Sequence, residues 1–159
     1  MLTKDYLYDG GIVMDLRLTF NEDALNYDRL RPSYTDELFD DIIRFSNLNS
    51  SKSTLEIGSV TGQATLPFLR SGSKVTAIEI GDKSAQFSRK KFAEFKTFKV
   101  INQDFESVQI DENVYDLVYS ASAFHWIPPF LKKISDTINR CCGKFTFFDT
   151  MILCMGRKP

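Results

Sequence analysis

Short apolar strand patterns and amphipathic helix patterns alternate along this chain from residue 54 onward. The strand patterns cover 54–58, 74–80, 98–102 and 115–120, and the helix patterns cover 63–70 and 83–95. This alternation is typical of βαβ units, whose right-handed crossovers form a parallel sheet with helices on both faces. We therefore expect an α/β fold with a doubly wound, mostly parallel sheet.

The segment before the first strand predicts a helix and a break. Thr35 is a candidate N-cap for a helix over 35–46, because acidic residues follow it and apolar residues then recur at helical spacing. Pro32 marks a break just before that helix. The first 20 residues leave three interpretations open: a short strand within 12–18, an arm or a frayed lead-in.

The C-terminal part of the chain continues the same plan. We expect a helix from Phe130 onward, and then a fifth strand over Phe145–Phe148 that runs on towards Cys154. All 159 residues are expected to form a single domain. Within it, residues 1–34 would be a lead-in and residues 35–159 the α/β core.

Composition and charge argue against several classes of function. The net charge is −1, from 20 basic and 21 acidic residues, so nothing points to nucleic acid or an anionic membrane as a partner. No run reaches the ~18 apolar residues of a membrane span, and the N-terminus lacks a leader pattern, so a cytoplasmic location is expected. One histidine and three cysteines without a C-x-x-C argue against a metal site and a disulfide framework.

Polar or glycine residues follow each of the first three core strands. Gly58 and Gly62 lie in a loop between the first strand and a helix, where doubly wound folds bind their ligands. Glu79 ends the second strand, where a carboxylate can accept both hydroxyls of a ribose. Asp104 follows the third strand, where a carboxylate can accept a hydrogen bond from the amino group of adenine. The alternatives are structural: turn glycines, a surface carboxylate at Glu79, and a turn cap at Asp104.

Together these features resemble the class I S-adenosyl-L-methionine-dependent methyltransferases of the small-molecule type. The first motif of that family corresponds to Glu56-Ile57-Gly58-Ser59-Val60-Thr61-Gly62. Its acidic residue at the end of the second strand corresponds to Glu79, and its adenine-contacting pair to Asp104-Phe105. The segment from Tyr27 to Tyr34 is similar to a lead-in that helps to roof the cofactor in one subgroup. The resemblance covers about residues 20–148.

The resemblance implies S-adenosyl-L-methionine as the cofactor and a set of residues that bind it. They are Glu56, Gly58, Ser59, Gly62, Glu79, Ile80, Asp104, Phe105, Ser120, Tyr27 and Arg31. It also implies methyl transfer to a small-molecule substrate, whose identity the sequence does not give. The catalytic base is not identified. His125 is a candidate, against the alternative of a packing residue among aromatic neighbours.

Two departures from the family pattern bear on function. Val60 stands where the family has the middle glycine of its first motif, and a β-branched side chain there could obstruct the cofactor. In addition, we count about five strands, so the last strands of the family sheet are expected to be missing. An unpaired fifth strand would invite pairing with a second copy, which makes a homodimer a further expectation.

Two other functions compete with methyl transfer. A non-catalytic, truncated methyltransferase-fold module for binding or dimerisation would explain Val60 and the low strand count, and a shortened gene product is a related alternative. A nicotinamide-dependent dehydrogenase needs the spacing G-x-G-x-x-G for its phosphate loop. Thr65 stands where a further glycine of that loop is wanted, so the spacing favours S-adenosylmethionine over a dinucleotide.

Overall fold

The computed structural model describes residues 6–9, 12–111, 114–121, 123, 144–148 and 151–155. Their main feature is a six-stranded sheet with the order β5-β4-β3-β6-β8-β7. The strands are β3 (Ser53–Ile57), β4 (Lys74–Glu79), β5 (Phe98–Asn102), β6 (Leu117–Ala121), β7 (Lys144–Phe148) and β8 (Met151–Met155). The first four are parallel to one another, as the alternating pattern predicts.

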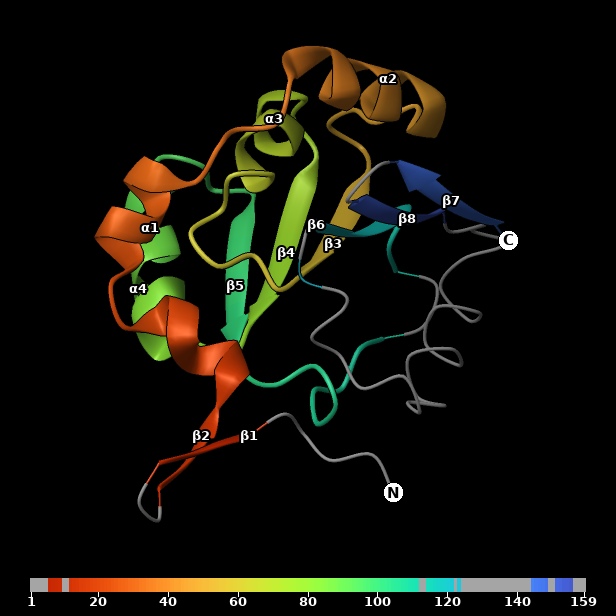
Figure 1. The fold of residues 1–159 in the computed structure, drawn as a ribbon. Helices are drawn as coiled ribbons and strands as arrows, with labels where there is room; N and C mark the ends of the chain where they lie inside the picture. The colour runs from red at the N-terminus through yellow and green to blue at the C-terminus, as the bar shows by residue number, and fades with distance from the viewer. Residues whose placement is uncertain are drawn as a thin grey trace.

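Helices lie beside this sheet, and a small separate hairpin lies at the N-terminal end of the chain (Figure 1). The helices are α1 (Ala24–Leu30), α2 (Asp36–Ser46), α3 (Thr65–Arg70) and α4 (Asp82–Lys91), and a 3-10 helix covers Leu16–Asn21. At the N-terminus β1 (Tyr6–Asp9) pairs with β2 (Ile12–Asp15) in antiparallel fashion. No helix among the described residues is long and apolar enough to cross a membrane.

Alternation along the strands divides the core between the two faces of the sheet. On one face, residues of α2 and α3 and Phe92, which follows α4, join Val75, Leu117 and Tyr119 in one buried cluster. On the other face, β-strand residues pack against Phe105 and Val108, which follow β5. Among the described residues, therefore, helices cover one face and an irregular segment covers the other. The helix expected from Phe130 onward lies outside the described residues.

The end of the sheet differs from the sequence prediction. The expected fifth strand over Phe145–Phe148 does not run on towards Cys154: the chain reverses after Phe148, and β8 returns antiparallel to β7. β8 inserts between β6 and β7 and pairs antiparallel with both, so the sheet has more than five strands and ends in a hairpin. β7 lies at the sheet edge. Pairing of that edge with a second copy stays a prediction.

Two helices are shorter than their patterns predict. The helix predicted over 83–95 is α4, which ends at Lys91. The helix predicted over 63–70 begins only at Thr65, because the backbone at Gly62 has φ +79° and cannot belong to a right-handed helix. α2 covers Asp36–Ser46 as expected, with Thr35 at the N-cap position but without a side-chain capping bond. It ends at Asn47, whose left-handed backbone closes the helix.

Side chains near the start of β3 and β6 set the register between these two central strands. Asp116, which is buried, accepts hydrogen bonds from the Ser53 backbone N–H at 2.9 Å and the Lys52 Nζ at 3.0 Å. These bonds fix the beginning of β3 beside the beginning of β6. The carboxyl ends of the parallel strands therefore lie together at the other end of the strands, where the loop after β3 lies.

Candidate functional site

The loop after β3 has a left-handed backbone at three positions: Gly58 (φ +71°), Val60 (φ +48°) and Gly62 (φ +79°). The two glycines also lack the space for a side chain. A Cβ at Gly58 would lie 2.5 Å from Ala123 Cβ, and a Cβ at Gly62 would lie 2.4 Å from the Phe92 ring. Both positions therefore need glycine, for conformation and for close packing.

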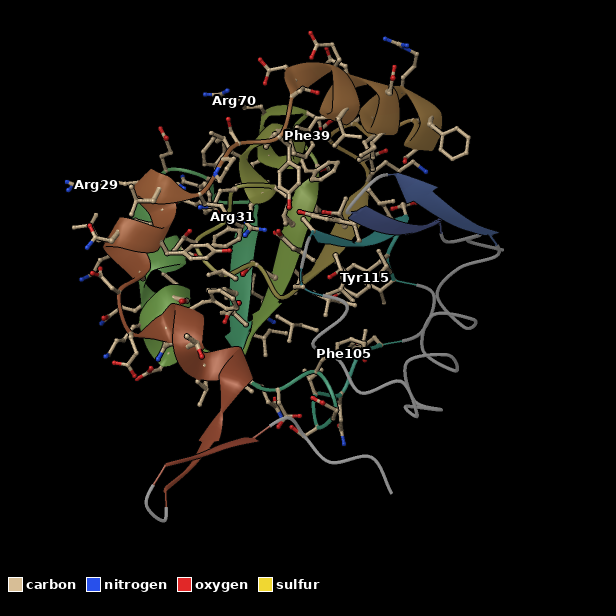
Figure 2. All side chains as sticks on the ribbon, viewed as in Figure 1. Arg29, Arg31, Phe39, Arg70, Phe105 and Tyr115 are labelled. Atoms are coloured by element: carbon tan, nitrogen blue, oxygen red, sulfur yellow. The ribbon has the colours of Figure 1, made fainter. Side chains whose placement is uncertain are left out.

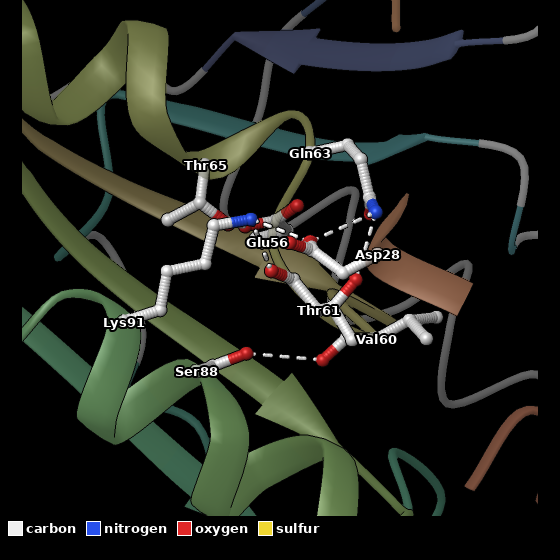
Figure 3. A network of polar contacts seen from close by, with 8 residues as sticks. All are labelled: Asp28, Glu56, Val60, Thr61, Gln63, Thr65, Ser88 and Lys91. Carbon is white, nitrogen blue, oxygen red and sulfur yellow. Dashed lines mark hydrogen bonds and ion pairs between the residues drawn. The ribbon is translucent and has the colours of Figure 1, made fainter. Parts of the chain in front are cut away.

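Val60 adopts the conformation of a glycine although its side chain is branched at Cβ. Such a residue at positive φ is a conformational outlier. Its backbone groups are fixed on both sides: the N–H donates to Glu79 Oε2 at 2.6 Å, and the carbonyl accepts from Ser88 Oγ at 3.0 Å. These two bonds hold the middle of the loop between the end of β4 and helix α4, and Figure 3 shows the one from Ser88.

Glu79 is the last residue of β4 and is 5% exposed. Its two carboxylate oxygens accept from different backbone groups, Oε2 from Val60 and Oε1 from the Gly81 N–H at 2.8 Å. Burial raises the pKa of Glu79, and the hydrogen bonds from backbone N–H groups act against that increase. Each oxygen keeps a second lone pair with which it can accept a hydroxyl.

Glu56 is a buried carboxyl group on the helical side of β3. Oε2 accepts from Thr65 Oγ1 at 2.5 Å and from the Tyr119 hydroxyl at 3.0 Å. Burial raises the pKa of Glu56 to about 7, and the two hydroxyl donors lower it by less. Near neutral pH this group therefore takes up or releases a proton, even though a free glutamate is fully ionised there.

A pocket lies beside this loop and joins it to helix α1. Its lining includes Tyr27 and Arg31 together with Glu56, Gly58 and Ser59. Figure 2 shows Arg31 directed over the sheet, whereas Arg29 of the same helix points away from the protein. The Arg31 guanidinium lies 5.8 Å from the centre of the Tyr27 ring. Ser59 brings a buried hydroxyl that has no hydrogen-bond partner among the described residues.

This arrangement has counterparts in known proteins. A model of the family described as "Methyltransferase domain" matches residues 55–144, which is more than half of the chain. The chain belongs to this methyltransferase family. Its members of class I use S-adenosyl-L-methionine as their cofactor, and the mostly parallel sheet and its helices match their Rossmann-like fold.

Curated relatives carry the same family assignment. A probable S-adenosylmethionine-dependent methyltransferase of Saccharomyces cerevisiae is 30% identical over 139 residues, which cover 82% of this chain and 46% of that protein. An rRNA adenine N-6-methyltransferase of Limosilactobacillus reuteri is 28% identical over 94 residues, covering 59% of this chain and 38% of that protein. The chain therefore spans less than half the length of these relatives.

Solved structures support the fold. A putative S-adenosylmethionine-dependent methyltransferase from Methanococcus maripaludis superposes with a TM-score of 0.61 at 10% identity, covering 96% of this chain and 98% of that one. A methyltransferase from Aquifex aeolicus superposes with a TM-score of 0.59 at 17% identity, covering 78% and 69%. At these identities the likeness concerns the fold alone.

The structure brings part of the predicted site together. Tyr27, Arg31, Glu56, Gly58 and Ser59 line one pocket. Glu79 contacts the same loop through its bond to Val60, and Gly62 closes the loop against α4. The lead-in and the glycine loop therefore meet as the resemblance implies, although they lie far apart in the sequence.

Three further predicted site residues, Asp104, Phe105 and Ser120, have structural partners within the chain. Both carboxylate oxygens of Asp104 bind Ser107, Oδ1 at its backbone N–H (2.8 Å) and Oδ2 at its hydroxyl (2.9 Å). Phe105 is buried in the cluster on the far face of the sheet. The Ser120 hydroxyl donates to the Ile57 carbonyl at 2.9 Å. Their roles toward the cofactor stay predictions.

Two more predicted residues need separate mention. The carbonyl of Ile80 accepts from the Asn102 side chain at 3.1 Å, so Ile80 is held beside the end of β5. His125 lies outside the described residues, and its role as a base stays a prediction. The described part of this methyltransferase has no group of three side chains that could hold a metal ion.

Sequence reasoning missed four polar residues that join the lead-in to the loop and to α4. They are Asn21, Asp28, Gln63 and Lys91. Asp28 lies within the segment that resembles the family lead-in, but the resemblance assigns none of the four a role, and the bonds that join them to the lead-in or to α4 span 35 to 63 positions of the chain. Their contacts become evident only from the fold, in which α1 packs against α4 (Figure 1).

The strain at Val60 predicts that Val60→Gly stabilises the protein. Relief of a positive φ at a β-branched residue is worth about 1–3 kcal/mol, and the greater freedom of glycine in the unfolded chain removes about 1 kcal/mol of this. We expect the free energy of unfolding to rise by about 1 kcal/mol, as measured by urea denaturation. Asn47→Gly, at φ 50°, is the matched control and should change less, because asparagine tolerates this conformation. A less stable Val60→Gly protein would contradict the strain.

The raised pKa of Glu56 predicts a pH-dependent stability. Because the pKa rises from 4.5 to about 7 on folding, the folded protein binds this proton more tightly than the unfolded chain does. The stabilisation is complete below about pH 4.5 and is lost as the pH rises through about 7, which amounts to about 3 kcal/mol. Denaturation curves across this range should show the decline, and Glu56→Gln should flatten it. Glu37→Gln, on the exposed side of α2, should leave it unchanged.

Proposed function

We propose that this chain binds S-adenosyl-L-methionine and transfers its methyl group to a small-molecule acceptor. The observation that carries the proposal is the pocket between the glycine loop and α1, which Arg31, Tyr27 and Ser59 all line and where the buried Ser59 hydroxyl has no partner among the described residues. Because the chain spans less than half of its curated relatives, the activity is proposed for this chain rather than taken from them.

The residues of the pocket fit this cofactor chemically. The Ser59 hydroxyl is buried without a partner, which is costly unless a ligand supplies one. The Arg31 guanidinium suits the carboxylate of the methionine part, because it can form a bidentate pair. The Tyr27 ring offers an electron-rich face that suits a positive sulfur. Glu79 keeps acceptor positions for ribose hydroxyls, and Asp104 with Phe105 would meet the adenine.

When bound, S-adenosylmethionine supplies a methyl group on a positively charged sulfur. Methyl transfer of this kind depends mainly on positioning, so the chain's own task is to hold two partners in line and to exclude water. The left-handed loop and the Val60–Glu79 bond preset one wall of the pocket. Tyr27 of α1 and Arg31, which follows α1, also line the pocket. His125 is proposed as the group that takes a proton from the acceptor.

Charge supports a small molecule over RNA as the acceptor. The rRNA methyltransferase from Limosilactobacillus reuteri acts on RNA by its name. RNA binding draws much of its affinity from lysine and arginine contacts to phosphates. This chain carries 20 basic against 21 acidic residues, which gives no excess of positive charge for such contacts.

One observation favours the non-catalytic alternative. Val60 and Gly81 already donate backbone N–H groups to the two oxygens of Glu79. The Glu79 carboxylate, which would accept hydrogen bonds from the ribose hydroxyls, thus already has a backbone donor at each oxygen. A module that keeps this fold for binding another partner, without turnover, would also have such a closed loop.

Calorimetric titration with S-adenosylmethionine and S-adenosylhomocysteine tests the proposal. We expect micromolar binding by the wild type and a loss of roughly 10-fold or more in Glu79→Gln, because an amide cannot accept at both sides. Formation of S-adenosylhomocysteine with a panel of small acceptors would then establish turnover, and turnover with RNA instead would overturn the acceptor class. No binding by well-folded wild-type protein would leave the non-catalytic module.

The two arginines of the α1 region allow a matched test of the pocket. Arg31→Met should weaken S-adenosylmethionine binding by roughly 10-fold, because the cofactor carboxylate loses a charge-assisted partner. Arg29→Met removes the same charge from a side chain that points away from the pocket and should bind as the wild type does (Figure 2). Equal affinities for the two variants would remove Arg31 from the site.

A further inference from the structure

The lead-in is anchored to helix α4 at both ends of that helix. At its N-terminus, the Asn21 side chain accepts from the backbone N–H groups of Lys83 at 2.8 Å and Ser84 at 3.0 Å. At its C-terminus, Lys91 Nζ donates to Asp28 Oδ1 at 2.6 Å. Helix α1 therefore spans α4 between a polar cap and an ion pair.

The Asp28 end of this span is also bound to the glycine loop (Figure 3). Lys91 Nζ donates to the Thr61 carbonyl at 3.1 Å. Gln63 Nε2 donates to Asp28 Oδ1 at 3.2 Å and to Thr61 Oγ1 at 2.8 Å. The carboxylate of Asp28 thus joins α1, the loop and α4 through two donors, both of which also bind Thr61.

This ion pair differs from an ordinary surface pair. Its side chains are 28% and 22% exposed, whereas those of the Arg44–Asp41 pair on α2 are 77% and 60% exposed. Lys91 Nζ also lies 5.4 Å from the centre of the Phe92 ring, the ring on which Gly62 packs. A shielded pair with several partners holds its geometry better than an isolated exposed pair.

Asp28 stands between the two α1-region residues that face the pocket. Tyr27 precedes it, and Arg31 follows one turn later, with its backbone N–H bonded to the Tyr27 carbonyl at 3.0 Å. We infer that Asp28, through Lys91 and Gln63, is a positioning residue that holds Tyr27 and Arg31 over the cofactor pocket. This inference rests on the proposed function for its ligand and on the contacts above for its geometry.

The anchor links cofactor binding to the closure of α1. With the ion pair formed, Tyr27 and Arg31 are already in place, so binding need not order them. Without it, α1 stays attached through Asn21 but its C-terminal half is free to move away from the loop. The effect on affinity should therefore appear as faster dissociation of the cofactor, with the folded core unchanged.

Hydrogen exchange and stopped-flow binding test this on the full chain. In Asp28→Asn and in Lys91→Met, we expect faster exchange of the amides of residues 24–30 and a rise of roughly 10-fold in the dissociation rate of S-adenosylhomocysteine. Asp41→Asn, which breaks the exposed pair on α2, is the matched control and should change neither. The exchanged pair Asp28→Lys with Lys91→Asp should restore both readouts in part, which a role in stability alone would not predict.

The outcomes separate this inference from the proposed function. If the wild type binds no cofactor but Asp28→Asn still accelerates exchange over 24–30, the anchor stands and the cofactor proposal fails. If the wild type binds and Asp28→Asn changes neither exchange nor dissociation, the anchor is overturned while the cofactor proposal stands. Loss of affinity in Asp28→Asn without faster exchange, or without rescue by the exchanged pair, also overturns the positioning role.

Discussion

The carboxylate of Glu79 fixes the loop on which the remainder of the site depends. It ends β4, is nearly fully buried, and accepts the N–H groups of Val60 and Gly81. A buried carboxylate without such donors would be strongly unfavourable, so the loop must bring Val60 close to it. That requirement explains why a β-branched residue keeps a left-handed backbone. Once Val60 is fixed, Gly58 and Gly62 are placed against Ala123 and Phe92, and one wall of the pocket follows.

Two buried carboxyl groups on neighbouring strands make the electrostatics of this region unusual. Glu79 raises the pKa of Glu56 by repulsion, in addition to the larger effect of burial. The backbone donors favour the ionised form at Glu79, while the pKa of Glu56 lies near neutrality. Burial thus raises the pKa of both groups, but only Glu79 has backbone donors that act against the increase, and the same donors tie it to the loop. A cationic ligand beside Glu56 would favour its ionised form, because opposite charges lower the pKa of an acid.

The sequence predicted the parallel core because its signal is local. β5 covers Phe98–Asn102, as its apolar run indicates, and the order of glycine loop, Glu79 and Asp104 follows from strand ends. The hairpin of β7 and β8 was not predicted because the run from Phe145 to Cys154 contains neither glycine nor proline, and only Asp149-Thr150 separates its two apolar stretches. The segment of α1 was read only as a lead-in, because its amphipathic pattern is short.

The contacts that assemble the site could not be predicted, since they are long-range and polar. Asp28 and Lys91 look like ordinary surface charges in the sequence, and only the packing of α1 on α4 makes them partners. Three segments of the chain thus come together at the site: the lead-in and the glycine loop, which line the pocket, and the end of β4, which holds the loop through Glu79. Each is fixed mainly by side-chain bonds to backbone groups of another segment. A ligand that contacts all three would stabilise the native arrangement as a unit, because it binds only where they are together. Binding and local order in this region are therefore linked, and α1 is the segment in which that linkage should be largest.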